Sequence, residues 1–275
     1  MIRRVGRNLG LLDSTAPAAS AQLETEGWAL LTGVFSPAEV AGLTAEIDAV
    51  YAATEPDVRF READRPDFRY EMYNRSPAVQ RAIAHPAILA AIEPLLGDDC
   101  HVIANTCWRN PPHFPGGPWH CDAGPHVPRP EGVPWDDRIP YPVFVIGAHL
   151  WLRDVTTADG PTAVIPGSHR SGRLPPRDRI NDPDLAYEGR TAVAPEAAAG
   201  DVLLFVSDCW HRGTPSQPGG QGRLFVQCHY GRRDIAQRVL TTDTINHVAP
   251  EARARIASER EAQLLGLHEP FFYDG

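Results

Sequence analysis

The chain has 275 residues, 43% of them apolar, and a formal net charge of -9. That length and apolar content can bury one large core, so we expect a single domain over 1–275. The acidic balance argues against a nucleic-acid or anionic-membrane surface, which needs clustered lysine and arginine. We therefore expect a small-molecule partner, no nucleic acid and no membrane, and the sequence predicts no particular oligomeric state.

The N-terminus and the cysteines indicate where the protein works. Arg7, Asn8 and Asp13 interrupt any apolar run, so residues 1–20 are expected to form a flexible tail rather than a secretory signal. The five cysteines fit neither a CxxC zinc site nor a dense disulfide framework, which favours a reducing environment. We expect a cytoplasmic protein, because no segment approaches the roughly 18 apolar residues of a membrane span.

Helices are predicted first along the chain. In "FSPAEVAGLTAEIDAV", Ser36 is a typical N-cap and Glu39 completes a capping box, followed by an apolar stripe at helical spacing. In "SPAVQRAIAHPAILAAIEPLLG", a second cap at Ser76 precedes a break before Pro86 and a helix ending at Gly97. These patterns predict helices that support another part of the molecule.

Strand-like runs separated by glycine and proline begin at residue 101. Their short spacing, with few intervening helices, predicts an antiparallel jelly-roll core rather than a parallel sheet. We expect a mainly β fold with flanking helices, divided into a helical buttress at 21–100, the core at 101–235 and a charged helical segment at 236–275. The predicted strands are "HVIANTCW", "PVFVIGAHLWL", "TAVIPG", "DVLLFV" and "RLFVQCHY".

A metal site is suggested by "WHCD". In an extended strand His120 and Asp122 leave the same face. An HxD pair alone is unspecific, but His211, after the apolar run "DVLLFV", can lie beside it in a jelly roll. Two histidines and one carboxylate are typical of non-haem Fe(II), and they leave coordination positions open for oxygen chemistry.

Arg223 lies twelve residues after His211, at the start of a predicted core strand. A dicarboxylate such as 2-oxoglutarate chelates iron at its 2-oxo acid end, and its far carboxylate then needs a charged partner. Arginine supplies a planar, bidentate fork for that purpose. Taken alone, an arginine at this position is more typical of a surface residue at a strand end.

Together these motifs resemble the phytanoyl-CoA dioxygenase family of Fe(II)/2-oxoglutarate-dependent oxygenases. The resemblance implies a double-stranded β-helix (cupin-like) core, O2 and 2-oxoglutarate as co-substrates, iron held by His120, Asp122 and His211, and 2-oxoglutarate anchored by Arg223. The motifs that carry it are "GWALLTGVFSPAEVAGLTAEIDAV", "WHCDAGPH", "DGPTAVIPGSHRSG", "AGDVLLFVSDCWHRGTPS" and "GRLFVQCHY".

Other co-substrate contacts follow from the same resemblance. The family often has a hydroxyl residue two positions after the second histidine, where this chain has Gly213, so Thr214 is the nearest candidate. Thr106 lies where the family tends to contact 2-oxoglutarate, and Trp108 shares its face by alternation. His149 is either near the co-substrate or a core histidine.

The retained Asp122 predicts the reaction type, because related halogenases lack this carboxylate and bind chloride instead. We expect hydroxylation or another oxidation of a small organic metabolite, from natural-product biosynthesis or of acyl type, with release of succinate and CO2. Three alternatives remain open: a zinc hydrolase built from His113, His120 and His126, a non-catalytic jelly-roll binding protein, and an iron isomerase that does not consume 2-oxoglutarate.

Substrate recognition is the least determined feature. The proline-rich loop at 123–140 is either a lid or an inert surface excursion. The arginine-bearing stretch at 59–75 either binds an anionic group or is a solvated face. His85, His101, His229, His247 and His268 are expected to be ordinary core or surface residues. The aromatic residues expected to line an apolar pocket are Trp108, Phe114, Trp119, Trp135 and Tyr141.

Overall fold

A computed structural model describes residues 12, 15–55, 67–122, 124–237 and 248–269. The helices are α2 (Ala18–Glu26), α3 (Pro37–Ala53), α4 (Met72–Arg75), α5 (Pro77–Ile83), α6 (Pro86–Leu96), α7 (Pro250–Ala254), α8 (Glu259–Leu264) and the 3-10 turns η2 (Thr157–Asp159) and η3 (Ser168–Ser171). The strands are β1 (Trp28–Leu31), β2 (Asp67–Tyr70), β3 (His101–Asn110), β4 (Val145–Trp151), β5 (Thr162–Val164), β6 (Val202–Val206), β7 (His211–Gly213) and β8 (Arg223–Gly231).

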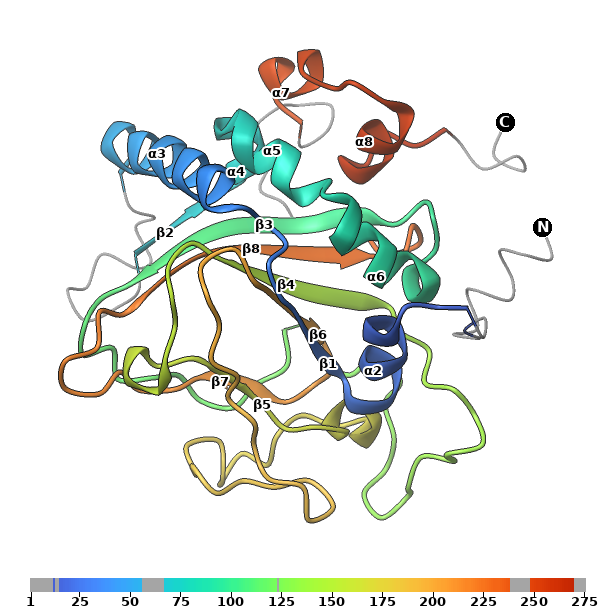
Figure 1. Ribbon diagram of the computed structural model, residues 1–275. Helices are drawn as coiled ribbons and strands as arrows, with labels where there is room; N and C mark the ends of the chain where they lie inside the picture. Colours follow the sequence, from blue (N-terminus) through green and yellow to red (C-terminus); the bar gives the residue numbers. More distant parts are fainter. Residues whose placement is uncertain (1–11, 13–14, 56–66, 123, 238–247, 270–275) are drawn as a thin grey trace.

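A six-stranded sheet forms the centre of the molecule, in the order β1-β6-β4-β8-β3-β2. Every pairing in it is antiparallel. A two-stranded sheet of β5 and β7 lies on one side of it, and α3, α5 and α6 lie on the other (Figure 1). The predicted mainly β, jelly-roll fold with flanking helices is therefore confirmed.

The predicted helix starts are also confirmed. The Ser36 side chain accepts a hydrogen bond from the Glu39 amide, and the Glu39 carboxylate accepts one from the Ser36 amide at 2.8 Å, which completes the capping box. Ser76 caps α5 by accepting from the amide of Val79 at 3.1 Å, and α6 ends just before Gly97. Local sequence signals thus set the bounds of the helices.

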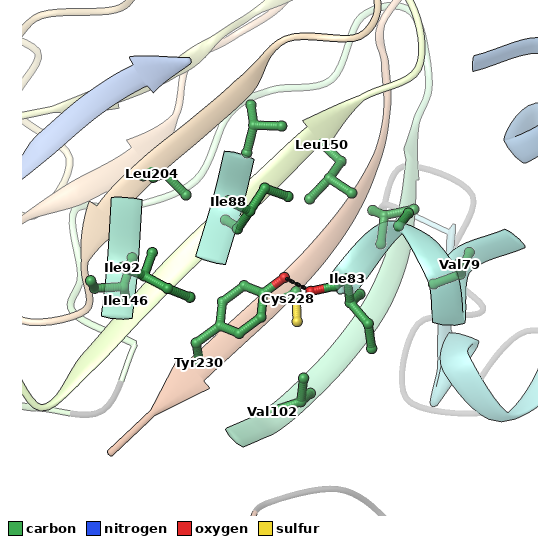
Figure 2. Packing of buried hydrophobic residues seen from close by; sticks show 14 of the residues in the cluster. Val79, Ile83, Ile88, Ile92, Val102, Ile146, Leu150, Leu204, Cys228 and Tyr230 are labelled. Atoms are coloured by element: carbon green, nitrogen blue, oxygen red, sulfur yellow. Dashed lines mark hydrogen bonds between the residues drawn. The ribbon is translucent and has the colours of Figure 1, made fainter. Parts of the chain in front are cut away.

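The helices bury their apolar faces against the large sheet and form the main core. Figure 2 shows Ile88 and Ile92 of α6 packed over sheet residues such as Ile146 and Leu204. The Tyr230 hydroxyl donates to the carbonyl of Ile83 at 2.8 Å and ties β8 to α5. This layer covers one face of the sheet with apolar contacts, and the polar side chains of the candidate site lie on the opposite face.

Strand β8 shows how the two faces divide, because alternate residues of a strand point to opposite sides. Its helix-facing residues all belong to the main core: Leu224, Val226, Cys228 and Tyr230. Phe225 instead joins a second cluster with Trp151, Leu203 and Phe205 on the side of the small sheet. The candidate site lies between this second cluster and the small sheet.

The two flanking segments contain helices, with further detail that the sequence did not predict. The buttress at 21–100 also supplies β1 and β2, which pair with β6 and β3 at the two edges of the large sheet. Runs of four residues are too short for a periodic signal, so only their pairing reveals them. In the described part of the predicted helical segment at 236–275 there are two short helices, α7 and α8, and Ser258 is the N-cap of the second. Within the described residues, no helix has the length and apolar character of a membrane span.

Candidate metal centre

Backbone pairing brings the two predicted segments together. His120 and His211 form an antiparallel bridge in which each amide donates to the other's carbonyl at 3.0 Å. Their rings lie 4.3 Å apart between centroids. Residues 91 positions apart in the sequence therefore carry neighbouring imidazoles, as the jelly-roll prediction required.

The side chains of His120, Asp122 and His211 form a cluster that can hold a metal ion, with one ligand atom from each lying within 4.8 Å of the others. Asp122 Oδ1 is 3.4 Å from His211 Nε2 and 3.8 Å from His120 Nε2. The Nδ1–H of His120 donates to the Pro118 carbonyl, and that of His211 donates to the Cys209 carbonyl, both at 2.9 Å. These hydrogen bonds leave both Nε2 lone pairs for a metal.

The charge of the cluster also suits a cation. Burial alone would raise the pKa of Asp122, but the neighbouring His211 and His229 hold it well below its usual range. Burial would lower the pKa of His211, and the carboxylate of Asp122 outweighs that effect and raises it. Asp122 is therefore ionised and ready to bind a divalent metal at neutral pH.

Arg223 lies at the other end of the site and is buried, with 4% of its surface exposed. Burial lowers the pKa of its guanidinium to about 9, so the group remains charged at neutral pH. Its Nη1 donates to Thr162 Oγ1 at 3.0 Å, and the Asn110 amide oxygen can accept from Nε and Nη2. No carboxylate pairs with Arg223 in the described part of the chain, so a bound anion would satisfy a costly buried charge.

Position 213, where the family often has a hydroxyl residue, is a glycine here for a steric reason. A Cβ atom on Gly213 would lie 2.5 Å from Arg223 Nη2, so any larger residue would displace the guanidinium. Thr214 does not replace the missing group, because its hydroxyl donates to the Pro161 carbonyl at 2.8 Å. Thr162, which the sequence did not single out, supplies the hydroxyl next to Arg223 instead.

A cavity of about 140 Å³ connects the metal ligands to Arg223. Trp108 lines it as predicted. Thr106 is not among the lining residues, but Trp108 Nε1 donates both to Thr106 Oγ1 at 2.8 Å and to Gln227 Oε1 at 2.7 Å. The lining residues are Trp108, Asn110, Phe114, Gly117, His120, His149, Thr162, His211, Gly213, Arg223, Phe225 and Gln227.

His149 projects into this cavity from β4 as a neutral imidazole. Burial, reinforced by the charge of Arg223, holds its pKa well below the usual range. Its Nδ1 lies 3.2 Å from Thr162 Oγ1. Arg223 can only donate to that oxygen, and the Thr162 hydroxyl has no other acceptor among the described residues, so it donates to Nδ1. The ring proton therefore sits on Nε2, a buried atom without a partner in the described structure.

Two histidines expected to form the alternative zinc site lie elsewhere. Within the described residues, neither His113 nor His126 belongs to the metal-ligating cluster. His126 Nδ1 lies 2.6 Å from Asp208 Oδ1, and the Tyr141 hydroxyl donates to Asp208 Oδ2 at 2.6 Å. Asp208 is buried and stands three residues before His211, so it ties both ends of the 124–141 segment to the metal-ligand strand.

The predicted aromatic lining was only partly correct. Trp108 and Phe114 line the cavity, whereas Trp119 packs beneath the small sheet and Tyr141 belongs to the main core. Trp135 packs against that core too. The arginine-bearing stretch at 59–75 falls partly on residues 56–66, outside the described residues.

His229 is the clearest residue that the sequence interpretation missed. It was expected to be ordinary, but its Nε2 lies 2.8 Å from Asp122 Oδ2. The signal that could have found it is the alternation of β8, since Gln227 and His229 share a face with Arg223. No comparable signal marks Thr162, because its role depends on which strand lies beside β8.

Comparison with known proteins places this site in a family. The family model for phytanoyl-CoA dioxygenase (PhyH) matches residues 23–220, which is more than half of the chain. Among solved structures, HygX from Streptomyces hygroscopicus with nickel and 2-oxoglutarate bound is similar, with 17% identity, a TM-score of 0.63 and coverage of 82% of this chain and 90% of that chain. EctD from S. alaskensis with 2-oxoglutarate and 5-hydroxyectoine has 21% identity, a TM-score of 0.63 and coverage of 84% and 82%.

SnoK, a non-heme alpha ketoglutarate dependent carbocyclase from nogalamycin biosynthesis, has 19% identity and a TM-score of 0.64 over 83% of this chain and 89% of that chain. At these identities the similarity shows the fold. Uncharacterised proteins of Mycobacterium bovis and Mycobacterium tuberculosis are 33% identical over 91 residues, or 33% of this chain. That match spans 30% of the length of the mycobacterial proteins.

Proposed function

This chain belongs to the phytanoyl-CoA dioxygenase family, and on that premise we propose that it hydroxylates a small organic molecule. Membership makes it an iron- and 2-oxoglutarate-dependent oxygenase, whereas hydroxylation and the substrate class are our proposal. One arrangement carries it: three metal-ligating side chains meet at one end of a cavity, and an arginine without a carboxylate partner among the described residues lies at the other.

The donor set fits ferrous iron. His120 and His211 present their Nε2 atoms and Asp122 presents an oxygen, which is the two-histidine, one-carboxylate set of non-haem Fe(II) oxygenases. With 2-oxoglutarate and O2, bound iron supplies the oxidant that removes hydrogen from a substrate C–H bond, while the co-substrate leaves as succinate and CO2. The carbonyls of Pro118 and Cys209 fix the two imidazole tautomers beforehand.

The far end of the cavity fits the other end of 2-oxoglutarate. Arg223 offers a buried guanidinium, already oriented by Thr162 and Asn110, to a carboxylate. His149 lines the same cavity as Arg223 and the two ligand histidines, and its Nε2–H is available as a further donor to an oxygen of the co-substrate. We propose Thr162 in the role that the sequence gave to Thr214.

Hydroxylation is the outcome that the ligand set favours. Related halogenases lack this carboxylate and bind chloride in its place, whereas Asp122 lies with the two histidines here, which supports oxidation rather than halogenation. The cavity wall is mainly apolar between its polar ends, with Trp108, Phe114 and Phe225 around it. Such a wall excludes water from the reacting carbon.

A small organic substrate is supported by the neighbours. HygX has been solved with hygromycin B bound, and SnoN in complex with nogalamycin RO. EctD has been solved with 5-hydroxyectoine. These ligands differ widely, so they support small metabolites as a class rather than any one compound.

The test is an anaerobic titration of the purified protein with Fe(II) and 2-oxoglutarate, monitored by the charge-transfer absorption of the chelate. We expect the band in the wild type and its loss in Asp122→Ala, which removes a ligand. Ile92→Ala, in the helix-facing core, is the control and should keep the band.

Succinate release is then measured in air against a panel of small metabolites, with mass analysis of each product. A product heavier by one oxygen atom supports hydroxylation. Absence of the chelate band in the wild type, or a hydrolytic activity restored by zinc, would overturn the proposal.

A further inference from the structure

The two carboxylate oxygens of Asp122 face different partners. Oδ1 lies towards the Nε2 atoms of His211 and His120, at 3.4 Å and 3.8 Å. Oδ2 lies 2.8 Å from Nε2 of His229, on the neighbouring strand β8. One oxygen is therefore turned to the metal position, and the other is engaged by a side chain outside the ligand set.

The direction of this hydrogen bond follows from chemistry. A metal-binding carboxylate is an anion and can only accept, so at 2.8 Å the His229 Nε2 carries the proton and donates it to Oδ2. His229 is 8% exposed and is held by β8, whose cavity face also carries Arg223 and Gln227. The donor is therefore fixed by the same strand that fixes the co-substrate arginine.

We propose that His229 is a positioning residue that keeps Asp122 a one-oxygen ligand of the metal, an inference that rests on the proposed function. Three protein donors leave three positions open on a six-coordinate ion. Chelating 2-oxoglutarate fills two of them and O2 needs the last. A carboxylate that bound through both oxygens would take that last position, and carboxylates do bind metals in both modes. By engaging Oδ2, His229 preserves the site for O2.

Orientation of a ligand by an outer hydrogen bond also changes metal affinity, typically by about 10- to 100-fold. A purely packing role for His229 would change stability alone. The two roles therefore separate when metal binding and folding stability are measured on the same variants.

The experiment compares wild type with His229→Phe, His229→Gln and Tyr230→Phe. Phenylalanine keeps a ring but removes the donor, whereas glutamine restores an N–H at similar reach. Tyr230→Phe is the matched control, because it removes one hydrogen bond from the opposite face of the same strand. Metal-free protein is titrated with Co(II) and followed by visible absorption, and thermal unfolding is recorded for each variant.

We expect His229→Phe to weaken Co(II) binding by about 10- to 100-fold, with His229→Gln within a few-fold of wild type. Tyr230→Phe should lower the unfolding temperature and leave Co(II) binding unchanged. With Fe(II) under argon, His229→Phe should give less chelate absorption per bound iron, because a two-oxygen Asp122 competes with 2-oxoglutarate.

Wild-type affinity in His229→Phe, or equal losses in the phenylalanine and glutamine variants, would overturn the inference. Failure of the wild type to bind Co(II) or to form the 2-oxoglutarate chelate would instead reject the proposed function. The two failures are therefore distinguishable in one set of titrations.

Discussion

The two faces of strand β8 share one backbone but differ in what they contain. Towards the helices the strand presents apolar side chains and the Tyr230 hydroxyl, which is satisfied by α5. Towards the cavity it presents Arg223, Phe225, Gln227 and His229, and the charge of Arg223 has no carboxylate partner in the described part of the chain. The first face stabilises the fold, and the second keeps polar groups ready for a ligand.

Along β8 the even-numbered residues therefore pack into the main core, and the odd-numbered residues face the side of the cavity. A shift of one residue in the pairing of β8 would exchange the two faces completely. The extensive pairing of β8 with both β3 and β4 fixes the register against such a shift. Substitutions on the two faces should therefore change different measured quantities.

The largest expected effect is at the cavity face. Replacing Arg223 with Met keeps the side-chain length and removes the charge that would hold the 2-oxoglutarate carboxylate. We expect 2-oxoglutarate affinity to fall by about 4 kcal/mol, close to a thousandfold, with little loss of stability. Chelate absorption at increasing 2-oxoglutarate measures this, and Arg223→Lys should lose less. Unchanged affinity would contradict the role of Arg223.

On the helix-facing side of the sheet, a substitution should lower stability and leave 2-oxoglutarate affinity unchanged. Ile92 is fully buried between α6 and the large sheet, so Ile92→Ala leaves a cavity. We expect the free energy of unfolding to fall by about 3 kcal/mol. Urea unfolding measures the loss, and 2-oxoglutarate affinity at low temperature should stay at the wild-type value. A variant that loses stability and affinity together would show that the two faces are coupled.

The free energy of unfolding should depend on pH through His169 of η3. This histidine is buried, and its Nε2 donates to the Glu24 carbonyl. Burial lowers the pKa of His169 from 6.5 to about 4. The unfolded chain takes up a proton there before the folded protein does, so stability falls as pH decreases through this interval. We expect about 2 kcal/mol of loss from this group between about pH 7 and about pH 5.

His169→Gln keeps a donor for Glu24 but cannot titrate. Urea unfolding at both pH values should therefore give a smaller difference for this variant than for wild type. Equal differences would mean that His169 does not contribute to the acid sensitivity.

The smallest effect is expected at Thr162, which links Arg223 to His149. Thr162→Val keeps the volume and removes the hydroxyl, so 2-oxoglutarate affinity should fall by about 1 kcal/mol, roughly fivefold. Thr162→Ser keeps the hydroxyl and should remain near wild type in the same titration. A serine variant as weak as the valine variant would point to the methyl group instead.

The sequence predicted most of the features that depend on residues close together in the chain. Ser36 and Glu39 marked a helix start, and the spacing of His120 and Asp122 marked one arm of the metal cluster. His211 and Arg223 required the further assumption of a jelly roll, which the fold confirms. The sequence thus named the three residues of the metal-ligating cluster and the buried arginine that lines the same cavity.

What the sequence did not predict depends on which strands become neighbours. Thr162 reaches Arg223 only because β5 lies beside β7, and His229 of β8 contacts Asp122, a residue 107 positions earlier in the chain. The edge strands β1 and β2 were missed for the same reason, since each is defined by its partner. Contacts between distant segments are not encoded in any local pattern.

The hydrogen bonds of Asp208 limit how the 124–141 segment can move relative to the metal cluster. It binds His126 and Tyr141, which lie near the two ends of the 124–141 segment, and it belongs to the stretch that leads into His211. Both anchorage points of this segment are therefore tied to the metal-ligand strand. A motion that kept these hydrogen bonds would involve only the residues between His126 and Tyr141, whereas rotation at either end would break a hydrogen bond to the buried Asp208 carboxylate.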